Sequence, residues 1–297
     1  MKAIKQNSLE AWILSIRPKT LTAALIPVAI GSAAAYTNGK FHWQPAQICA
    51  LFACLMQIAA NLMNDLYDYL KGADKEDRIG PERTVLQGWI TLKAMKTSIR
   101  SVLLMACLTG SLLLWYGSWQ LILVGALCLL FAYLYTGGPY PLAYYGAGDL
   151  LVIIFFGIIP VCGTYYVQTQ TITTDVWIAS LVSGMTINTM LIMNNYRDRD
   201  SDRKSNKHTL IVRFGEPFGR YFYLLTGVIA SLLCLWFLRS GHYYAALLPQ
   251  LYLIPHFLTW RKAVKIRTGK ALNVTFGETA HNMLLMGLLL TVGLLLG

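Results

Sequence analysis

Uninterrupted apolar runs of about twenty residues recur along the whole chain, and nearly every charged residue lies in the short segments between them. A helix needs roughly 20 apolar residues to cross the hydrocarbon core of a bilayer. Backbone polar groups cannot remain unpaired there, so such segments must be helical. Because the runs are continuously apolar, they also lack the alternation of a membrane β-barrel. The pattern predicts an all-α, polytopic membrane protein.

Nine runs meet this length requirement. They cover residues 18–37, 45–69, 97–116, 119–136, 148–168, 176–196, 218–238, 242–260 and 279–296. The first run follows basic residues and ends in small ones, as a signal peptide does, but we interpret it as the first membrane helix. We expect a single nine-helix domain over residues 1–297, with weakly related halves at about 18–136 and 148–260.

The polar composition excludes several other classes of protein. The net charge of +11 lies in the loops between apolar runs, so it indicates membrane topology and not nucleic-acid binding. The six cysteines lie inside apolar runs without a C-x-x-C pair, which argues against a disulfide framework or a zinc site. The expected surroundings are therefore the lipid bilayer, and no feature of the sequence indicates a protein partner.

The basic residues predict the orientation of the chain in the membrane. Of the 25 lysines and arginines, all but Lys40 and Arg239 fall in alternate segments, which are residues 1–20, 71–100, 197–220 and 261–270. Positively charged loops remain on the cytoplasmic side. We therefore expect a protein of the inner, or cell, membrane with a cytoplasmic N-terminus and an external C-terminus. Only Asp175 of the 14 acidic residues falls on the external side.

Two groups of acidic and amide residues lie at the cytoplasmic ends of predicted spans. The first contains Asn61, Asn64, Asp65 and Asp68, and the second contains Asn195, Asp198 and Asp202. Within each group, a spacing of three or four residues places the side chains on one face of a helix. A carboxylate that faces lipid costs several kcal/mol. We therefore expect both faces to point into the helix bundle.

The residue types in these groups predict a magnesium site that binds a phosphate compound. Closely packed carboxylates repel each other, and Mg²⁺ prefers oxygen ligands of this kind together with substrate phosphate oxygens. The predicted metal ligands are Asn64, Asp65, Asp68, Asp74, Asp198 and Asp202. The predicted phosphate-binding residues are Lys71, Arg78, Arg83, Arg197 and Lys207. The alternative is a set of solvated helix ends with surface ion pairs, which applies best to the acids of residues 74–82.

Tyrosines cluster near the same side of the membrane. They are Tyr67, Tyr69, Tyr133, Tyr135, Tyr140, Tyr144 and Tyr145. Most are interpreted as membrane-interface anchors. Tyr135, beside the Thr136-Gly137-Gly138-Pro139 turn, is the best candidate to stabilise a carbocation with its ring face. The predicted catalytic residues are Asp68, Asp198, Asp202 and Tyr135.

The two acidic motifs, Asn64-Asp65-Leu-Tyr-Asp68 and Asp198-Arg-Asp-Ser-Asp202, resemble those of the UbiA superfamily of membrane prenyltransferases. The segments 71–83 and 194–215 are most similar to the menaquinone branch, the 1,4-dihydroxy-2-naphthoate polyprenyltransferases. The resemblance covers essentially the whole chain. It departs from the wider superfamily at Gly72, where a third acid is often found, and at Asn206, which replaces a glycine. Asparagine tolerates a left-handed backbone nearly as well as glycine.

The resemblance implies a Mg²⁺-dependent transfer of a polyprenyl group from polyprenyl diphosphate to 1,4-dihydroxy-2-naphthoate. Diphosphate and CO₂ would be lost, and the product would be a demethylmenaquinone. The isoprenoid tail would lie among apolar helices that open to lipid. Arg17 is a candidate to bind the acceptor's carboxylate, although a positive anchor at a helix end is the simpler interpretation.

Other functions remain open at this point. A sister enzyme could use 4-hydroxybenzoate or another aromatic acid as acceptor. A secondary transporter would place its acids near the middle of the membrane and not at helix ends. A scaffold with charged loops would leave Asp68, Asp198 and Asp202 unexplained. The positions of the acids favour an enzyme.

Overall fold

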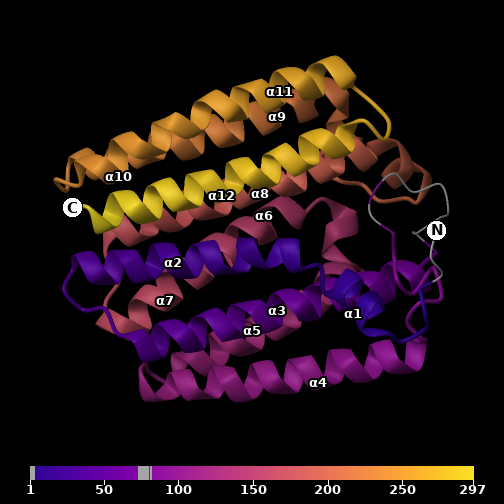
Figure 1. Cartoon of the computed structure of the whole chain (residues 1–297), viewed down its shortest axis with the longest axis horizontal. Helices are drawn as coiled ribbons and strands as arrows, with labels where there is room; N and C mark the ends of the chain where they lie inside the picture. The colour runs from indigo at the N-terminus through magenta and orange to yellow at the C-terminus, as the bar shows by residue number, and fades with distance from the viewer. Residues whose placement is uncertain (1–3, 73–79, 81) are drawn as a thin grey trace.

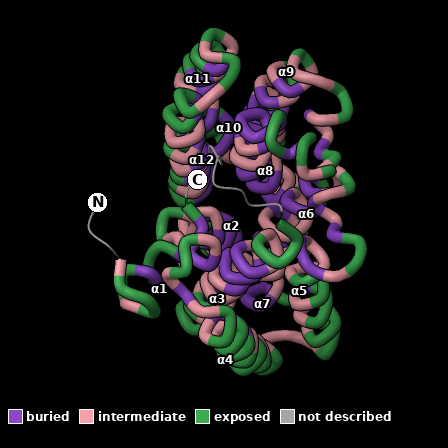
Figure 2. Tube along the Cα trace, turned by 90° about the vertical axis from the view of Figure 1, so that its right-hand side faces the viewer, coloured by how far each residue is buried: buried purple, intermediate pink, exposed green. Residues whose placement is uncertain are grey.

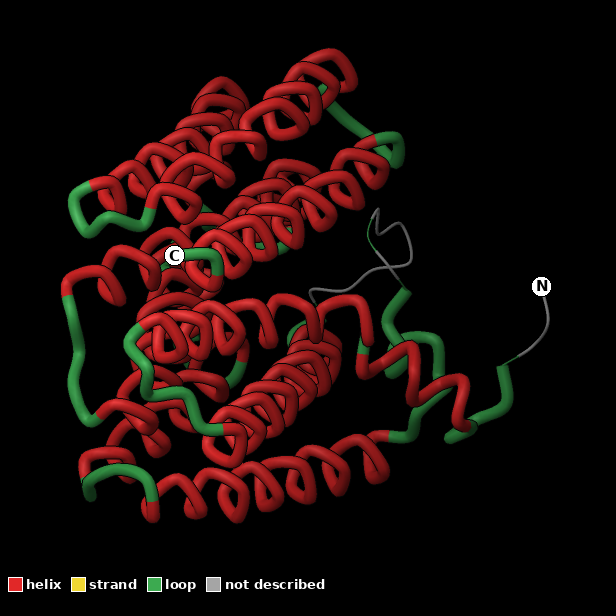
Figure 3. The backbone as a smooth tube through the Cα atoms, turned by 60° about the vertical axis from the view of Figure 1, so that its left-hand side comes forward, coloured by secondary structure: helices red, strands yellow, loops and turns green. Residues whose placement is uncertain are grey.

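The computed structural model describes residues 4–72, 80 and 82–297, and this part of the chain contains helices and loops but no strand (Figure 3). The α-helices are α1 (Leu9–Ile16), α2 (Leu21–Thr37), α3 (Trp43–Leu70), α4 (Leu92–Ser111), α5 (Gln120–Thr136), α6 (Gly148–Ile153), α7 (Ile159–Thr169), α8 (Thr174–Lys204), α9 (Leu210–Leu233), α10 (Tyr243–Leu247), α11 (Leu253–Ile266) and α12 (Leu272–Leu295). The shorter turns are η1 (Pro18–Thr20), η2 (Leu112–Trp115), η3 (Leu142–Tyr145), η4 (Ile154–Ile158), η5 (Cys234–Leu238) and η6 (Leu248–Tyr252). The all-α prediction is confirmed.

The protein is a multi-pass membrane protein. Among the described residues, seven helical segments are long and apolar enough to cross a bilayer. They are Leu9–Thr37, Trp43–Leu70, Leu92–Trp115, Gly148–Thr169, Thr174–Lys204, Leu210–Leu238 and Leu272–Leu295. The predicted span 119–136 corresponds to α5, which is shorter at 17 residues, and span 242–260 falls on the run α10–η6–α11. The count of nine membrane crossings stays a prediction.

The helices lie side by side along one direction, with α9 and α11 at one edge of the bundle and α4 at the other (Figure 1). Helix α2 is central and packs against α3, α7, α8 and α12. Buried residues gather between the helices, whereas outward faces are exposed (Figure 2). The C-terminus and α1 lie at opposite ends of the bundle (Figure 1).

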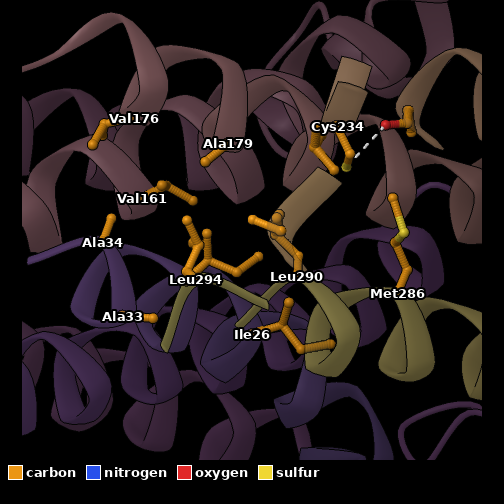
Figure 4. Close-up of a cluster of buried hydrophobic side chains, with 14 of the residues drawn as sticks. Ile26, Ala33, Ala34, Val161, Val176, Ala179, Cys234, Met286, Leu290 and Leu294 are labelled. Carbon is orange, nitrogen blue, oxygen red and sulfur yellow. Dashed lines mark hydrogen bonds between the residues drawn. The ribbon is translucent and has the colours of Figure 1, made fainter. Parts of the chain in front are cut away.

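The largest core cluster joins α2, α7, α8, α10 and α12 (Figure 4). Many of its members are small, such as Ala33 and Ala34 on α2 and Ala179 on α8, while Leu290 on α12 supplies bulk. Small residues let helix backbones approach closely, which increases van der Waals contact where no hydrophobic force drives helices together. This core therefore combines close helix packing at small residues with the volume of larger side chains.

The sharpest example of close packing is the crossing of η4 with α8. An added Cβ on Gly157 would lie 2.7 Å from the Cα atom of Gly184, and one on Gly184 would lie 2.7 Å from the carbonyl oxygen of Ile153. The chain has a π-helical turn here, followed by Pro160, which has no N–H to donate. The Oγ of Ser183 donates to the carbonyl of Phe156 at 3.2 Å. The predicted straight span 148–168 is thus interrupted, and a neighbouring helix satisfies its backbone.

Two helix ends differ from the prediction and shape the site. Helix α8 continues past residue 196 to Lys204, so the second acidic motif is helical throughout. After it, Asn206, which stands where the wider superfamily often has glycine, adopts a left-handed backbone with φ of 55°. Asparagine tolerates this conformation. Helix α9 then begins at a Thr209 cap and kinks at Gly215, whose φ is 88°. The predicted span 218–238 is the part beyond this kink.

We expect Gly184→Ala to destabilise the protein by about 1–3 kcal/mol, because the added methyl group meets backbone atoms that have no rotamer to change. Gly163→Ala is the matched control, since a Cβ there has no neighbouring atom within 4 Å. Thermal unfolding of the two variants in detergent provides the measurement. Equal melting temperatures would contradict the importance of this crossing.

Candidate active site

The first acidic motif ends helix α3, and its Asp65 has a structural position. This residue is buried, with 1% of its surface exposed. Its Oδ2 accepts hydrogen bonds from the hydroxyl and backbone N–H of Thr84 and from the hydroxyl of Ser15. Asp65 thereby holds α1 and the segment before α4 against the end of α3. Its Oδ1 has no hydrogen-bond partner in the described parts of the chain.

Asp68, one turn later, points to different partners. One Nη of Arg83 lies 2.8 Å from its Oδ2, and the hydroxyl of Tyr144 donates to its Oδ1 at 3.0 Å. Its side chain is mostly buried, with 15% exposed. A carboxylate so placed needs a cation nearby, and Arg83 provides one. Asp68 is therefore held by an arginine and a tyrosine from later in the chain.

The second motif is organised by Arg197 on α8. This arginine is buried, with 2% of its surface exposed. Its Nε and one Nη donate to the two oxygens of Asp198, each at 2.7 Å. It also donates to the side-chain oxygens of Asn194 at 2.8 Å and Asn273 at 3.2 Å, and its guanidinium lies 5.0 Å from the ring centroid of Phe276. Arg197 fixes the orientation of Asp198.

Asp202 and Asn195 complete the polar face of α8. The Nζ of Lys207 lies 3.4 Å from an oxygen of Asp202, and its backbone N–H donates to the carbonyl of Asp202 at 2.9 Å. Asn195 is 4% exposed, and its Oδ1 finds no hydrogen-bond donor within the described ranges. A buried amide oxygen without a donor is an oxygen ligand in need of a partner.

Tyr144 in η3 connects the two motifs. Its hydroxyl binds Asp68, and its ring centroid lies 5.2 Å from the Nζ of Lys71 and 5.9 Å from that of Lys207. Its carbonyl accepts from the backbone of His208 at 2.8 Å. Partial burial lowers the pKa of the Lys71 ammonium, and the Asp68 carboxylate opposes that shift. The sequence interpretation assigned Tyr144 to the membrane interface, because its partners are distant in the sequence.

A cavity of about 550 Å³ lies beside the first motif, between α2, α3, α4, α5 and α7. Asn61, Asn64 and Tyr135 line its polar end, and nearly all its other lining residues are apolar. It reaches Cys49 near the opposite end of α3, a length of about 22 Å at 1.5 Å per residue. The predicted catalytic residue Tyr135 therefore lies at the polar end of this otherwise apolar cavity.

The remaining predicted site residues are distributed around this region. Lys71 donates to the carbonyl of Thr136 at 2.7 Å. Arg17 has a left-handed backbone between α1 and η1, and its carbonyl accepts from the backbone and hydroxyl of Thr20. Asp74 and Arg78 lie outside the described residues. Thr84, which follows Arg83, binds Asp65, whereas Thr209 caps α9.

The oxygen atoms at this end of the bundle have the chemistry of a divalent-cation site. Carboxylates and a buried amide oxygen, that of Asn195, are hard ligands. Across the described ranges, however, no three acidic, histidine or cysteine side chains are grouped closely enough to hold a metal ion. Three of the acids are instead paired with a cation of the chain, in the pairs Asp68–Arg83, Asp198–Arg197 and Asp202–Lys207.

The model of the UbiA prenyltransferase family matches residues 24–286. The 1,4-dihydroxy-2-naphthoate octaprenyltransferase of Escherichia coli is 37% identical over 232 residues, which are 76% of this chain and 75% of that protein. The enzyme of the same name from Bacillus subtilis is 29% identical over 96% of this chain and 92% of its own length.

Solved structures show the same fold at low sequence identity. A UbiA homologue from Aeropyrum pernix K1 superimposes with a TM-score of 0.71 at 15% identity, covering 93% of this chain and 97% of that one. A UbiA homologue from Archaeoglobus fulgidus, solved with DMAPP and Mg²⁺ bound, gives a TM-score of 0.68 at 14% identity, covering 95% and 99%.

We expect Arg197→Met to lower the free energy of unfolding by about 3–5 kcal/mol, because it leaves the Asp198 carboxylate buried without its partner. The double variant Arg197→Met/Asp198→Asn removes that charge as well and should regain much of the loss. Thermal unfolding of both proteins in detergent tests this. If the double variant were no more stable than the single one, Arg197 would stabilise the fold without pairing with Asp198.

Proposed function

Since the chain belongs to the UbiA prenyltransferase family, we propose that it transfers a polyprenyl group from a polyprenyl diphosphate to 1,4-dihydroxy-2-naphthoate, giving a demethylmenaquinone in its reduced, hydroquinone form. The bond between the first prenyl carbon and oxygen breaks, and its electron pair leaves with diphosphate. The acceptor ring forms the new carbon–carbon bond. Its carboxylate leaves as CO₂, and the released electron pair restores the aromatic ring. The relatives' names support this substrate pair.

One arrangement carries the proposal. Asn64 of the first acidic motif lines the polar end of a long apolar cavity. Tyr144 binds Asp68 of the same motif, and its ring lies 5.9 Å from Lys207, which pairs with Asp202 of the second motif. A diphosphate with an isoprenoid tail has the same division into a charged head and an apolar chain. The cavity volume lies within the usual range for small-molecule sites. We place the tail along the apolar wall that α4 and α5 contribute to the cavity, with its reactive end at Asn64 and Tyr135.

The cations around Tyr144 are suited to hold the diphosphate. Lys71 and Lys207 both lie within 6 Å of the Tyr144 ring centroid, and Arg83 pairs with the Asp68 to which the same tyrosine donates. Charge-assisted hydrogen bonds from such groups are strong and favour the leaving group as its charge develops. Arg197 was predicted to share this role. Its donors are already bonded to Asp198, Asn194 and Asn273, so we assign it to positioning Asp198.

The oxygen donors at this end of the bundle are of the type that Mg²⁺ prefers, and we propose that Asn64, Asp68, Asp198 and Asp202 hold it, with Asp65 and Asp74 as further predicted ligands. When bound, the metal neutralises the diphosphate and makes it a better leaving group. The Archaeoglobus fulgidus homologue described with bound Mg²⁺ supports this choice. Asp65 already accepts three hydrogen bonds through one oxygen, which favours a structural role for it.

Tyr135 and the cavity walls complete the proposed chemistry. Tyr135 lines the polar end of the cavity, where a ring face stabilises an allylic cation electrostatically. The apolar walls exclude water, which would otherwise capture that cation. The ring of Tyr135 and the apolar walls act at the reactive end of the prenyl group, so both effects should be the same for short and long prenyl chains.

We also propose that the site faces the cytoplasm of the cell, in its inner membrane, with an external C-terminus. The basic residues of the alternate segments support this orientation. Reporter fusions at Lys40 and Gly297 should both be external. A cytoplasmic reporter at Gly297 would show that the crossings are miscounted.

We expect purified protein with Mg²⁺ and one polyprenyl diphosphate to prenylate 1,4-dihydroxy-2-naphthoate in preference to 4-hydroxybenzoate. Mass spectrometry of the products identifies the acceptor used. Efficient prenylation of 4-hydroxybenzoate, with none of the naphthoate, would replace the proposed acceptor and leave the proposed diphosphate site intact. Protein carrying Asp198→Asn serves as the inactive control.

We expect Asp68→Asn to lower kcat by about 100-fold or more. The substitution removes a negative charge that binds the metal and that balances the basic residues around the diphosphate. Asp175→Asn is the matched control. That carboxylate lies at the start of α8, where it accepts from Trp236 and Ser240, and its loss should leave kcat nearly unchanged. Chelation should abolish wild-type turnover, and added Mg²⁺ should restore it. Turnover that survives chelation would refute the metal requirement.

A further inference from the structure

Gln57 is a polar residue deep within the apolar cavity. It lies on α3 seven residues before Asn64, on the helix face that also carries Asn61, and it lines the cavity with both of them. At 1.5 Å per residue, it is about 10 Å farther from the membrane surface than Asn64. Burying an amide among apolar walls is unfavourable unless its hydrogen bonds are made.

The surrounding hydrogen bonds determine which way the Gln57 amide points. Asn61 donates through Nδ2 to the carbonyl of Ile16 at 2.8 Å and to the hydroxyl of Thr20 at 2.9 Å, so its Oδ1 must accept. The donor is Nε2 of Gln57, at 3.3 Å, which also lies 3.2 Å from the Thr20 hydroxyl. Because the Thr20 hydroxyl donates to the carbonyl of Arg17, it is satisfied without the oxygen of Gln57.

This arrangement leaves the Oε1 of Gln57 without a donor. The atom is buried and has no hydrogen-bond partner in the part of the chain that the structure describes. A buried acceptor left unpaired destabilises the state that contains it, so a ligand that brings a donor is favoured at this point. An isoprenoid tail has no donor, and an ionised diphosphate has none either.

We infer that Gln57 Oε1 accepts a hydrogen bond from a phenolic hydroxyl of the aromatic acceptor, which makes Gln57 a specificity-determining residue. This inference rests on the proposed function. The acceptor carries two hydroxyl groups and is flat, and the cavity offers an aromatic wall in which the rings of Phe131 and Phe155 lie 5.3 Å apart. Gln57, Asn61 and Thr20 form one network, so the hydroxyl would bind a preorganised oxygen.

The test compares inhibitors that differ in hydroxyl groups. The inhibition constants of 2-naphthoate, 1-hydroxy-2-naphthoate and 4-hydroxy-2-naphthoate are measured against 1,4-dihydroxy-2-naphthoate for wild type and Gln57→Leu. One hydroxylated acid should bind wild type about tenfold more tightly than 2-naphthoate, the size expected for one hydrogen bond. In Gln57→Leu this ratio should approach one, while the KM of the diphosphate changes less than twofold.

The control is Met56→Leu, which alters an apolar lining residue next in sequence and should keep the wild-type ratio. A purely structural role for Gln57 would weaken all three inhibitors equally and overturn the inference, as would a wild-type ratio near one. If wild type turns over the dihydroxy acid and the ratio survives in Gln57→Leu, only this inference fails. A wild type that does not turn over the acid would refute the proposed function itself.

Discussion

A carboxylate buried at the polar end of the bundle needs an opposite charge or hydrogen-bond donors, and this requirement organises that end of the protein. Asp68 pairs with Arg83, Asp198 with Arg197 and Asp202 with Lys207. The desolvation of an isolated charge there would exceed what packing of small residues returns. The cations therefore lie close to the acids within a mostly apolar protein, and the connecting segments take the courses that bring these cations into place.

Much of this arrangement is readable from the sequence, because it depends on periodicity. Spacings of three and four residues place Asn61, Asn64, Asp65 and Asp68 on one helical face, and apolar runs show which segments become helices. The expected left-handed backbone at Asn206 is likewise a local property, and it is confirmed. Local rules also anticipate that the acids stand at helix ends, which excludes a site in the middle of the membrane.

What the sequence does not reveal are partners that only the fold brings together. Tyr144 reaches Asp68 across 76 positions, and no local pattern separates it from the neighbouring interface tyrosines. Asp65 and Asp68 belong to one motif but have different surroundings, since one faces Thr84 and Ser15 and the other faces Arg83. The unpaired oxygen of Gln57 emerges only when the whole network around Asn61 is considered.

The two partners of each ion pair lie close together in the sequence, and this affects when the pairs can form during biosynthesis. Arg83 follows Asp68 by 15 positions, and Arg197 directly precedes Asp198, so each pair is complete soon after its helix is made. Membrane insertion proceeds from the N-terminus, and domains fold as they emerge. Each of these two acids can therefore be paired with its cation while its half of the chain enters the bilayer. The contacts of Tyr144 with Lys207 and His208, and that of Arg197 with Asn273, must wait for later parts of the chain, so the site closes late in assembly.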